Sequence, residues 1–295
     1  MEQRYATGTV PLVCLLLVGG GIGLTNNVAK IGLAHGVPLL ALLFWAVAGG
    51  AVLLTVIAVI AKTPPAFDRR TLIYGLVSGL LLMALPTGIT YLAARHVGSG
   101  FVSLSLAFVP LITYVFAVLL KIEANRWVRL AGVIAGLAGA LVLAFGKTRM
   151  PDAEPIWIAA TLAIPVIIAT GNIYRTLRWP PGAASLSLAP LMLAGAALWL
   201  LPLAASQAGA VIASGAGLVL ACAQAVIFTM TYSLYFVLQR IAGAVYLSQI
   251  GSVGAVTGAG IAVIVFGEAM PPGFAIAAGL IVVGLALFNI RHKAA

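Results

Sequence analysis

The stretch RHVGSGFVSLSLAFVPLITYVFAVLLKIE at residues 95–123 places a mainly apolar run, residues 100–120, between charged ends. A helix needs roughly 20 such residues to cross the hydrocarbon core of a bilayer. Nine further runs before and after it are bounded in the same way by charges, proline or glycine. The ten predicted spans are residues 10–31, 37–61, 72–94, 100–120, 127–146, 155–174, 183–205, 209–238, 245–267 and 271–290. The sequence therefore predicts an all-α integral membrane protein with ten transmembrane helices.

The composition of the chain supports a membrane environment. Of the 295 residues, 63% are hydrophobic and 7% are charged, whereas about a quarter of the residues in a soluble domain are charged. This balance excludes a soluble Rossmann enzyme, a nucleic-acid-binding domain and a secreted disulfide scaffold. The expected partners are the lipid bilayer and a small-molecule substrate. No nucleic acid and no obligatory protein partner are expected, so the chain should work as a monomer or a weak homodimer.

Lysine and arginine are distributed unequally between the two sides of the predicted bundle. With ten spans, both termini share a side that holds twelve of the sixteen basic residues, against four on the other side. The twelve are Arg4, Lys62, Arg69, Arg70, Lys121, Arg126, Arg129, Arg175, Arg178, Arg240, Arg291 and Lys293. Loops rich in Lys and Arg stay in the cytoplasm. The N- and C-termini are therefore predicted to be cytoplasmic, with the chain in a bacterial inner membrane.

The two halves of the chain share rare residues at a constant offset. A shift of 145 residues brings Arg95 onto Arg240, Gly98 onto Gly243 and Glu123 onto Glu268. Residues 1–146 and 147–295 would then each contain five helices. Because five is odd, the second copy enters the membrane from the opposite side, which makes the repeats inverted. Transporters with this architecture bind substrate near the midplane, between the halves.

Residues 91–145 resemble the EamA repeat of the drug/metabolite transporter superfamily. The resemblance is carried by an Ala/Arg run, a Gly-Ser-Gly break, a Ser-rich helix with Pro110 at its centre, a Leu-Leu-Lys-Ile-Glu ending and a Gly-studded final helix. The second half is similar through Gln239-Arg240, Gly243 and Phe266-Gly267-Glu268, although Ala255 stands where the first half has Pro110. A narrower resemblance is to YddG-type exporters of aromatic and other amino acids. The family implies a basket-like bundle in which eight helices surround a central cavity and spans 5 and 10 lie outside.

No charged group that could drive transport or catalysis lies in the middle of a predicted span. The acidic residues all fall in a tail, a loop or a helix end, and they are Glu2, Asp68, Glu123, Asp152, Glu154 and Glu268. Proton relays in transporters use Asp, Glu or His within the membrane, so a facilitator is expected. The sequence contains neither a His-Glu-x-x-His motif nor a membrane aspartate. Catalytic residues, cofactors and a metal site are therefore not expected.

Neutral polar and aromatic side chains within the spans are the candidate substrate-binding residues. They are Asn26, Asn27, Trp45, Tyr91, Ser103, Ser105, Asn172, Gln224, Tyr232, Gln249 and Ser252. A polar group that faces lipid without a partner is costly, so these groups should face the bundle interior or a wet cavity. Hydrogen bonds within or between helices are the alternative for Ser and Thr. The amides of Asn27, Gln224 and Gln249 favour a cavity, because an amide can bind both ends of a zwitterion.

Prolines and paired glycines occur within the predicted spans. Pro86 and Pro110 are the candidate hinges, with static kinks as the alternative, because proline removes a helix hydrogen bond. Glycine pairs four residues apart predict close helix contacts, and they are Gly19/Gly23, Gly75/Gly79, Gly132/Gly136 and Gly254/Gly258.

The function that best fits these features is transport of small organic solutes by alternating access through a neutral polar cavity, with amino acids, including aromatic ones, as the leading substrates. One alternative is an exporter of drugs or other small metabolites. A membrane scaffold and an intramembrane enzyme are the alternatives from other classes.

Overall fold

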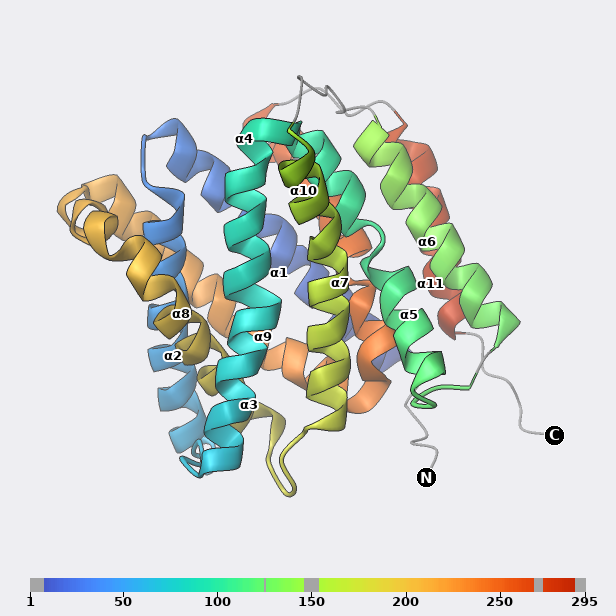
Figure 1. Cartoon of the computed structure of the whole chain (residues 1–295), viewed down its shortest axis with the longest axis horizontal. Helices are drawn as coiled ribbons and strands as arrows, with labels where there is room; N and C mark the ends of the chain where they lie inside the picture. The colour runs from blue at the N-terminus through green and yellow to red at the C-terminus, as the bar shows by residue number, and fades with distance from the viewer. Residues whose placement is uncertain (1–7, 125, 146–153, 268–272, 290–295) are drawn as a thin grey trace.

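The computed structural model describes residues 8–124, 126–145, 154–267 and 273–289, and these form a bundle of helices without strands (Figure 1). Six helical stretches in these ranges are long and apolar enough to cross a membrane, and four shorter apolar helices accompany them. The long ones are α1 (Thr9–Ala34), α2 (Leu39–Ile60), the stretch Arg69–Thr90, α7 (Pro155–Leu177), α8 (Ser185–Ala213) and α9 (Gly215–Ser248). The shorter ones are α5 (Val109–Leu119), α6 (Trp127–Phe145), α10 (Ile250–Phe266) and α11 (Phe274–Asn289). Each of the ten predicted spans overlaps one of these stretches, with differences at several ends.

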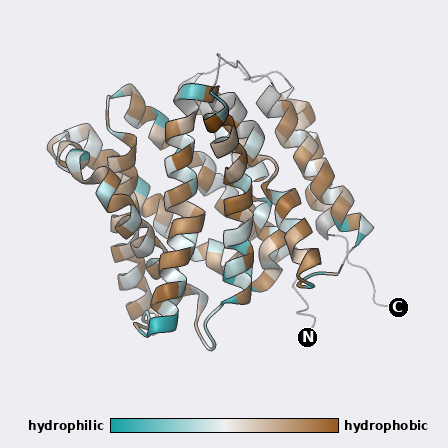
Figure 2. Cartoon of the chain, viewed as in Figure 1, coloured by the Kyte–Doolittle hydropathy of each residue, from teal (hydrophilic) through white to brown (hydrophobic). Residues whose placement is uncertain are grey.

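The surface of the bundle is apolar along the bodies of the helices. Large hydrophobic side chains such as Val52, Ile60 and Leu203 are exposed, and Figure 2 shows the hydrophilic residues gathered mainly at helix ends and loops. Exposed apolar surface on this scale suits lipid and not water. The described part of the chain is therefore that of a multi-pass membrane protein.

The third span begins at an aspartate cap. Asp68 accepts hydrogen bonds from the backbone N–H groups of Arg70 and Thr71 and from the Thr71 hydroxyl, which satisfies donors that the first turn of a helix leaves free. The Thr71 hydroxyl and N–H groups lower the pKa of the Asp68 carboxyl below its usual value.

The same span contains a widened turn. Helix α3 (Arg69–Gly79) continues through a π-helical turn, η1 (Leu80–Ala84), into α4 (Leu85–Leu106), and the N–H of Leu85 bonds to the carbonyl of Leu80. Pro86, which is buried, follows directly. Proline has no N–H and crowds the preceding turn, so a π turn before it relieves the conflict. A hinge role for Pro86 stays a prediction, but the local irregularity that a hinge needs is present.

Helix α4 corrects one sequence-based expectation. Its helical turns run on to Leu106, but Figure 1 shows the chain turning over at the upper end of α4, so the third and fourth spans are separate arms as predicted. The predicted span 100–120 is divided, because α4 ends at Leu106 and α5 starts at Val109. Pro110 therefore lies in the first turn of α5 and not at the centre of a helix. A proline is well tolerated in that position, since the first turn does not use its missing N–H.

The break between the eighth and ninth spans lies at Gly243. Its backbone φ of 80° and ψ of 175° interrupt the helical geometry inside α9. Glycine adopts such a positive φ without the strain that a Cβ would cause. The short segment after it leads directly into α10.

Glycines bring several helix pairs into close contact, as predicted. A Cβ added to Gly23 of α1 would lie 2.6 Å from the backbone nitrogen of Gly258 in α10, and one on Gly284 of α11 would lie 2.7 Å from the carbonyl oxygen of Gly132 in α6. Between α3 and α8, a Cβ on Gly79 would meet the backbone of Ala196. Helices in membranes associate largely through such close packing.

Candidate functional site

A single arginine is the most deeply buried charge in the described part of the chain. Arg175 lies near the end of α7, and its side chain has no exposed surface. The Nε–H group donates a long hydrogen bond, 3.4 Å, to the hydroxyl of Tyr74 in α3. The two terminal nitrogens, Nη1 and Nη2, have no hydrogen-bond partner. Because arginine stays protonated in proteins, this is a full positive charge with most of its donors unused.

Aromatic rings from α9 and α3 surround the guanidinium group. Its central carbon lies 3.8 Å from the ring centroid of Phe236 and 4.6 Å from that of Tyr235. The ring of Trp179 contacts Tyr74 and Phe236, with centroid separations of 6.2 and 6.0 Å. Aromatic faces attract a cation, and the attraction is strongest away from water. The rings therefore replace part of the solvation that burial removes.

Neutral polar groups line the same part of the α7–α9 contact. The amide of Gln239 donates to the backbone oxygen of Asn172 and to the hydroxyl oxygen of Thr176, each at 3.1 Å. The hydroxyl of Tyr235 donates to Oδ1 of Asn172 at 3.3 Å. The other end of the Gln239 amide, Oε1, is buried and has no partner. We call Tyr74, Asn172, Arg175, Tyr235, Phe236 and Gln239 the Arg175 cluster. It thus holds both unused donors and an unused acceptor.

None of the carboxylates in the described residues neutralises Arg175. Asp68 is bound to the start of α3, and Glu123 forms an ion pair with Arg129. Burial raises the pKa of the Glu123 carboxyl, and the Arg129 guanidinium opposes that rise. Glu154 precedes α7 and is separated from Arg175 by 21 residues of sequence, about 31 Å along a helix. The cluster therefore carries a net positive charge.

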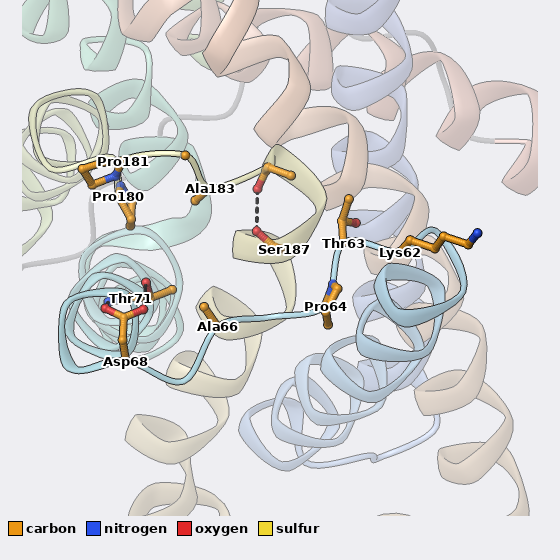
Figure 3. Close-up of a pocket in the computed structure, with 12 residues that line it drawn as sticks. Lys62, Thr63, Pro64, Ala66, Asp68, Thr71, Pro180, Pro181, Ala183 and Ser187 are labelled. Carbon is orange, nitrogen blue, oxygen red and sulfur yellow. Dashed lines mark hydrogen bonds between the residues drawn. The ribbon is translucent and has the colours of Figure 1, made fainter.

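A surface pocket of about 430 Å³ lies between the loop from α2 to α3 and the loop from α7 to α8 (Figure 3). Its lining includes Asp68 and Thr71 at the start of α3 and Ala183 and Ser187 on the other side. Trp179 connects the pocket with the cluster: its indole N–H donates to the carbonyl of Ala183 at 3.2 Å, while its ring packs on Tyr74 and Phe236.

The structure brings two of the predicted binding residues to this place. Asn172 is a member of the cluster, and the Tyr232 ring lies 5.4 Å from that of Tyr235. The Tyr232 hydroxyl donates to the sulfur of Met83 at 3.7 Å.

Other predicted residues make structural contacts elsewhere. Asn27 donates to the carbonyl of Gly23, at 2.9 Å, and to that of Gly258, at 3.1 Å, which joins α1 to α10. Trp45 donates to the carbonyl of Ala208 at 3.0 Å and so joins α2 to α8. Ser105 donates to Val102 within its own helix. The Ser105 bond is the local contact that stood as the alternative to a cavity lining for Ser and Thr.

The remaining predicted residues fall into three groups. Gln224, Gln249 and Ser252 are buried, and Gln224 Oε1 and Gln249 Nε2 have no partner. Asn26 is exposed on α1. The side chains of Tyr91 and Ser103 lie outside the described residues.

Arg175 is the candidate site residue that sequence reasoning missed. It was counted among the basic residues of the cytoplasmic side, because it follows the predicted end of the sixth span at Tyr174. Helix α7 in fact continues to Leu177. The signal that could have identified it is spacing: Asn172, Arg175 and Thr176 are three and four residues apart and share one helix face.

Comparison with known proteins agrees with this architecture. Residues 10–145 match the model of the EamA-like transporter family. A WAT1-related protein of Arabidopsis thaliana is 32% identical over 90 residues, which are 28% of this chain and 25% of the relative, so the match spans a quarter of that relative's length. A crystal structure of another protein superposes with a TM-score of 0.72 at 19% identity, covering 94% of each chain, and shows the shared fold. Residues 10–145 of this membrane chain are thus similar to the EamA-like transporter family, which is the resemblance that the sequence motifs indicate.

Proposed function

We propose that this protein transports amino acids, including aromatic ones, across the bacterial inner membrane by alternating access. The observation that carries the proposal is the Arg175 cluster, a buried set of aromatic and polar side chains with unused hydrogen-bonding groups inside a bundle of EamA type. Buried polar groups are normally satisfied, so unsatisfied ones at one place favour a ligand there.

The pairing of helices supports two inverted halves, residues 1–146 and 147–295. Helix α2 packs on α8 and α6 on α11, which are the second and fifth spans of each proposed half. Helix α1 packs on α10, and α7, its counterpart in the second half, packs on α5. When the two halves are exchanged, the α1–α10 contact becomes the α7–α5 contact, and the α2–α8 and α6–α11 contacts map onto themselves. A two-fold axis between the repeats requires this pattern.

The charge distribution supports a facilitator with cytoplasmic termini. Among the described carboxylates, Asp68, Glu123 and Glu154 precede or follow helices and none lies within one. Lys62, Arg69 and Arg70 flank the loop from α2 to α3, which favours a cytoplasmic position for that end. Transport would then follow the substrate gradient.

The experiment is flux of labelled amino acids into liposomes that contain the purified protein, with and without a pH gradient. Saturable flux that is indifferent to the gradient is expected. A flux that the gradient drives would contradict the facilitator, and absence of flux for every amino acid would direct the search to drugs or other metabolites.

A further inference from the structure

We propose that Arg175 and Gln239 form a receptor for a zwitterion, in which the guanidinium group binds the substrate carboxylate and Gln239 Oε1 accepts a hydrogen bond from its ammonium group. The inference rests on the proposed function and names the residues that would select its substrates. It is carried by the unused groups of the cluster: Nη1 and Nη2 of Arg175 as donors and Oε1 of Gln239 as acceptor, all buried.

The donor side of the receptor suits a carboxylate. Two free nitrogens at the end of a planar guanidinium group match the two oxygens of a carboxylate in a bidentate pair. The cluster holds one positive charge that no described carboxylate neutralises, so a group with a single negative charge completes it. A phosphate dianion would leave excess negative charge in an apolar bundle, where uncompensated charge is costly.

A bound carboxylate could replace the hydrogen bond that Arg175 makes to Tyr74 and leave its contacts with the aromatic rings in place. The hydrogen bond to the Tyr74 hydroxyl, at 3.4 Å, is longer than a strong N–H···O bond. The guanidinium carbon lies over the rings of Tyr235 and Phe236, whereas a carboxylate would bind the free Nη1 and Nη2 groups. The cation can therefore remain on the rings while these groups bind substrate.

The acceptor side is held in a fixed orientation. Gln239 Nε2 donates to two oxygens of α7, one from Asn172 and one from Thr176. Because both partners are acceptors toward this amide, the nitrogen belongs on the α7 side and the oxygen points away from those contacts. An ammonium group supplies the donor that Oε1 lacks. The receptor thus distinguishes an amino acid from a simple carboxylic acid and from a simple amine.

One side chain, Trp179, links the receptor with the surface pocket between the two loops. The pocket (Figure 3) is lined in part by Ala183, and Trp179 binds the carbonyl of Ala183 with its N–H group while its ring packs on Phe236. We expect movement of Trp179 to control how substrate reaches the receptor from that side.

The test compares three ligands that share one aromatic side chain: L-phenylalanine, L-phenylalaninamide, which lacks the carboxylate, and 3-phenylpropionate, which lacks the ammonium group. Binding to the wild type is measured by the rise in thermal unfolding temperature, and transport by flux in liposomes. Phenylalanine should bind at least about 30-fold more tightly than the amide, the loss typical when a buried charge loses its partner. It should bind at least about tenfold more tightly than 3-phenylpropionate, the effect of one hydrogen bond from a charged group.

The variants are Arg175→Lys, Arg175→Gln and Gln239→Leu, with Thr229→Val as the control. Thr229 is also buried on α9 and donates to the carbonyl of Ala225 within that helix, but it lies outside the cluster. Gln239→Leu should lose the preference for phenylalanine over 3-phenylpropionate while Thr229→Val retains it. Arg175→Gln should lose the preference over the amide, and Arg175→Lys should keep part of it.

The ligand comparison on the wild type does not depend on whether an arginine variant folds. Flux of phenylalanine and its amide with equal KM, or equal thermal shifts for the two, would overturn the receptor and leave transport of amino acids standing. Preferential binding of phenylalanine without flux of any amino acid would instead overturn the proposed function and support the receptor.

Discussion

The guanidinium carbon of Arg175 lies 3.8 Å from the ring centroid of Phe236, and both side chains are fully buried. A cation–π pair is weak at an exposed surface and gains strength where water is excluded. In the described part of this chain, the ring takes the place that a counter-ion would occupy. The pair joins α7 to α9, so the same contact stabilises the fold and holds the charged group of the candidate site in place.

Replacement of Phe236 by leucine should therefore destabilise the protein beyond the loss of apolar volume. The cation–π contribution at a desolvated site is about 2 kcal/mol, and the Tyr235 ring would retain part of it. Phe228→Leu is the matched control, because Phe228 is also buried in α9 and packs on Tyr232 without touching the arginine. The free energy of unfolding, measured in mixed detergent micelles, should fall by about 1–2 kcal/mol more for Phe236→Leu than for Phe228→Leu. Equal losses would show that the ring acts through its volume alone.

Much of the fold could be predicted from the sequence, because an apolar run of about 20 residues is as long as a helix that crosses the bilayer. The break at Gly243 was also predicted, since it follows Arg240 at the end of a span. The division at residues 107 and 108 was not, because Pro110 is compatible both with a kinked helix and with a helix start.

The candidate site was predicted only in part. Asn172 was found because an amide inside an apolar run is conspicuous. Arg175 was missed because an arginine near the end of a span normally reaches water or lipid headgroups. Its burial arises from rings on α3 and α9, which are distant in sequence. Contacts of that kind do not show in the periodicity of a single helix.

Asn27 and its neighbour Asn26 should differ in their effect on stability. Asn27 donates to backbone oxygens in both α1 and α10, whereas Asn26 is exposed. Interhelical hydrogen bonds in membranes contribute about 0.6 kcal/mol on average and reach about 1.7. Asn27→Ala should lower the free energy of unfolding by about 1 kcal/mol, and Asn26→Ala should leave it almost unchanged. If Asn27→Ala left stability intact but raised the KM for transport, Asn27 would belong to the substrate site after all.

A methyl group at Gly79 should separate α3 from α8. Its Cβ would meet the backbone of Ala196 and lie 2.6 Å from the carbonyl oxygen of Met192, neither of which can move independently of its helix. Gly88→Ala is the control, since a Cβ there meets nothing within 4 Å. Gly79→Ala should cost about 1–3 kcal/mol, as overpacking does, while Gly88→Ala should be neutral or stabilising by up to about 1 kcal/mol. Comparable unfolding temperatures for the two variants would contradict the close contact.

The cap of α3 should give the protein an acid-sensitive component of stability. Because the folded chain lowers the pKa of Asp68, its carboxylate stabilises the fold above the ordinary carboxyl value of 3.8 and loses that effect as the pH falls through the lower, folded-state pKa. Asp68→Ser keeps a capping oxygen without the titration. The difference in unfolding temperature between wild type and Asp68→Ser should shrink as the pH is lowered from 6 to below 3.8.

Glu154→Ser provides the comparison for that experiment. Glu154 precedes α7 and makes no side-chain hydrogen bond to its first turn. Its replacement should therefore leave the unfolding temperature at pH 6 almost unchanged, whereas Asp68→Ser should lower it. A pH-independent difference for Asp68→Ser would mean that the Thr71 bonds do not depend on the charge of the carboxyl.

Trp179 should control access from the pocket of Figure 3 to the Arg175 cluster. Its indole N–H holds the carbonyl of Ala183, which lines that pocket. Trp179→Phe keeps an aromatic ring on Tyr74 and Phe236 but removes the hydrogen bond. Loss of this hydrogen bond, which contributes about 1 kcal/mol, should raise the population of the open loop between α7 and α8 about fivefold. The measurement is the rate at which a thiol reagent labels Ala183→Cys, in a Cys222→Ser background because Cys222 is exposed.

Trp199→Phe is the matched control for this last prediction. Trp199 also donates its indole N–H to a backbone oxygen, that of Leu76, at the same 3.2 Å distance, but it is half-exposed and lies outside both the pocket and the cluster. Its replacement should leave the labelling rate at position 183 unchanged, because the loop does not depend on it. Equal acceleration by both variants would point to general loosening of the bundle. Acceleration by Trp179→Phe alone, reversed by saturating phenylalanine, would show that the same side chain closes the site and responds to its occupant.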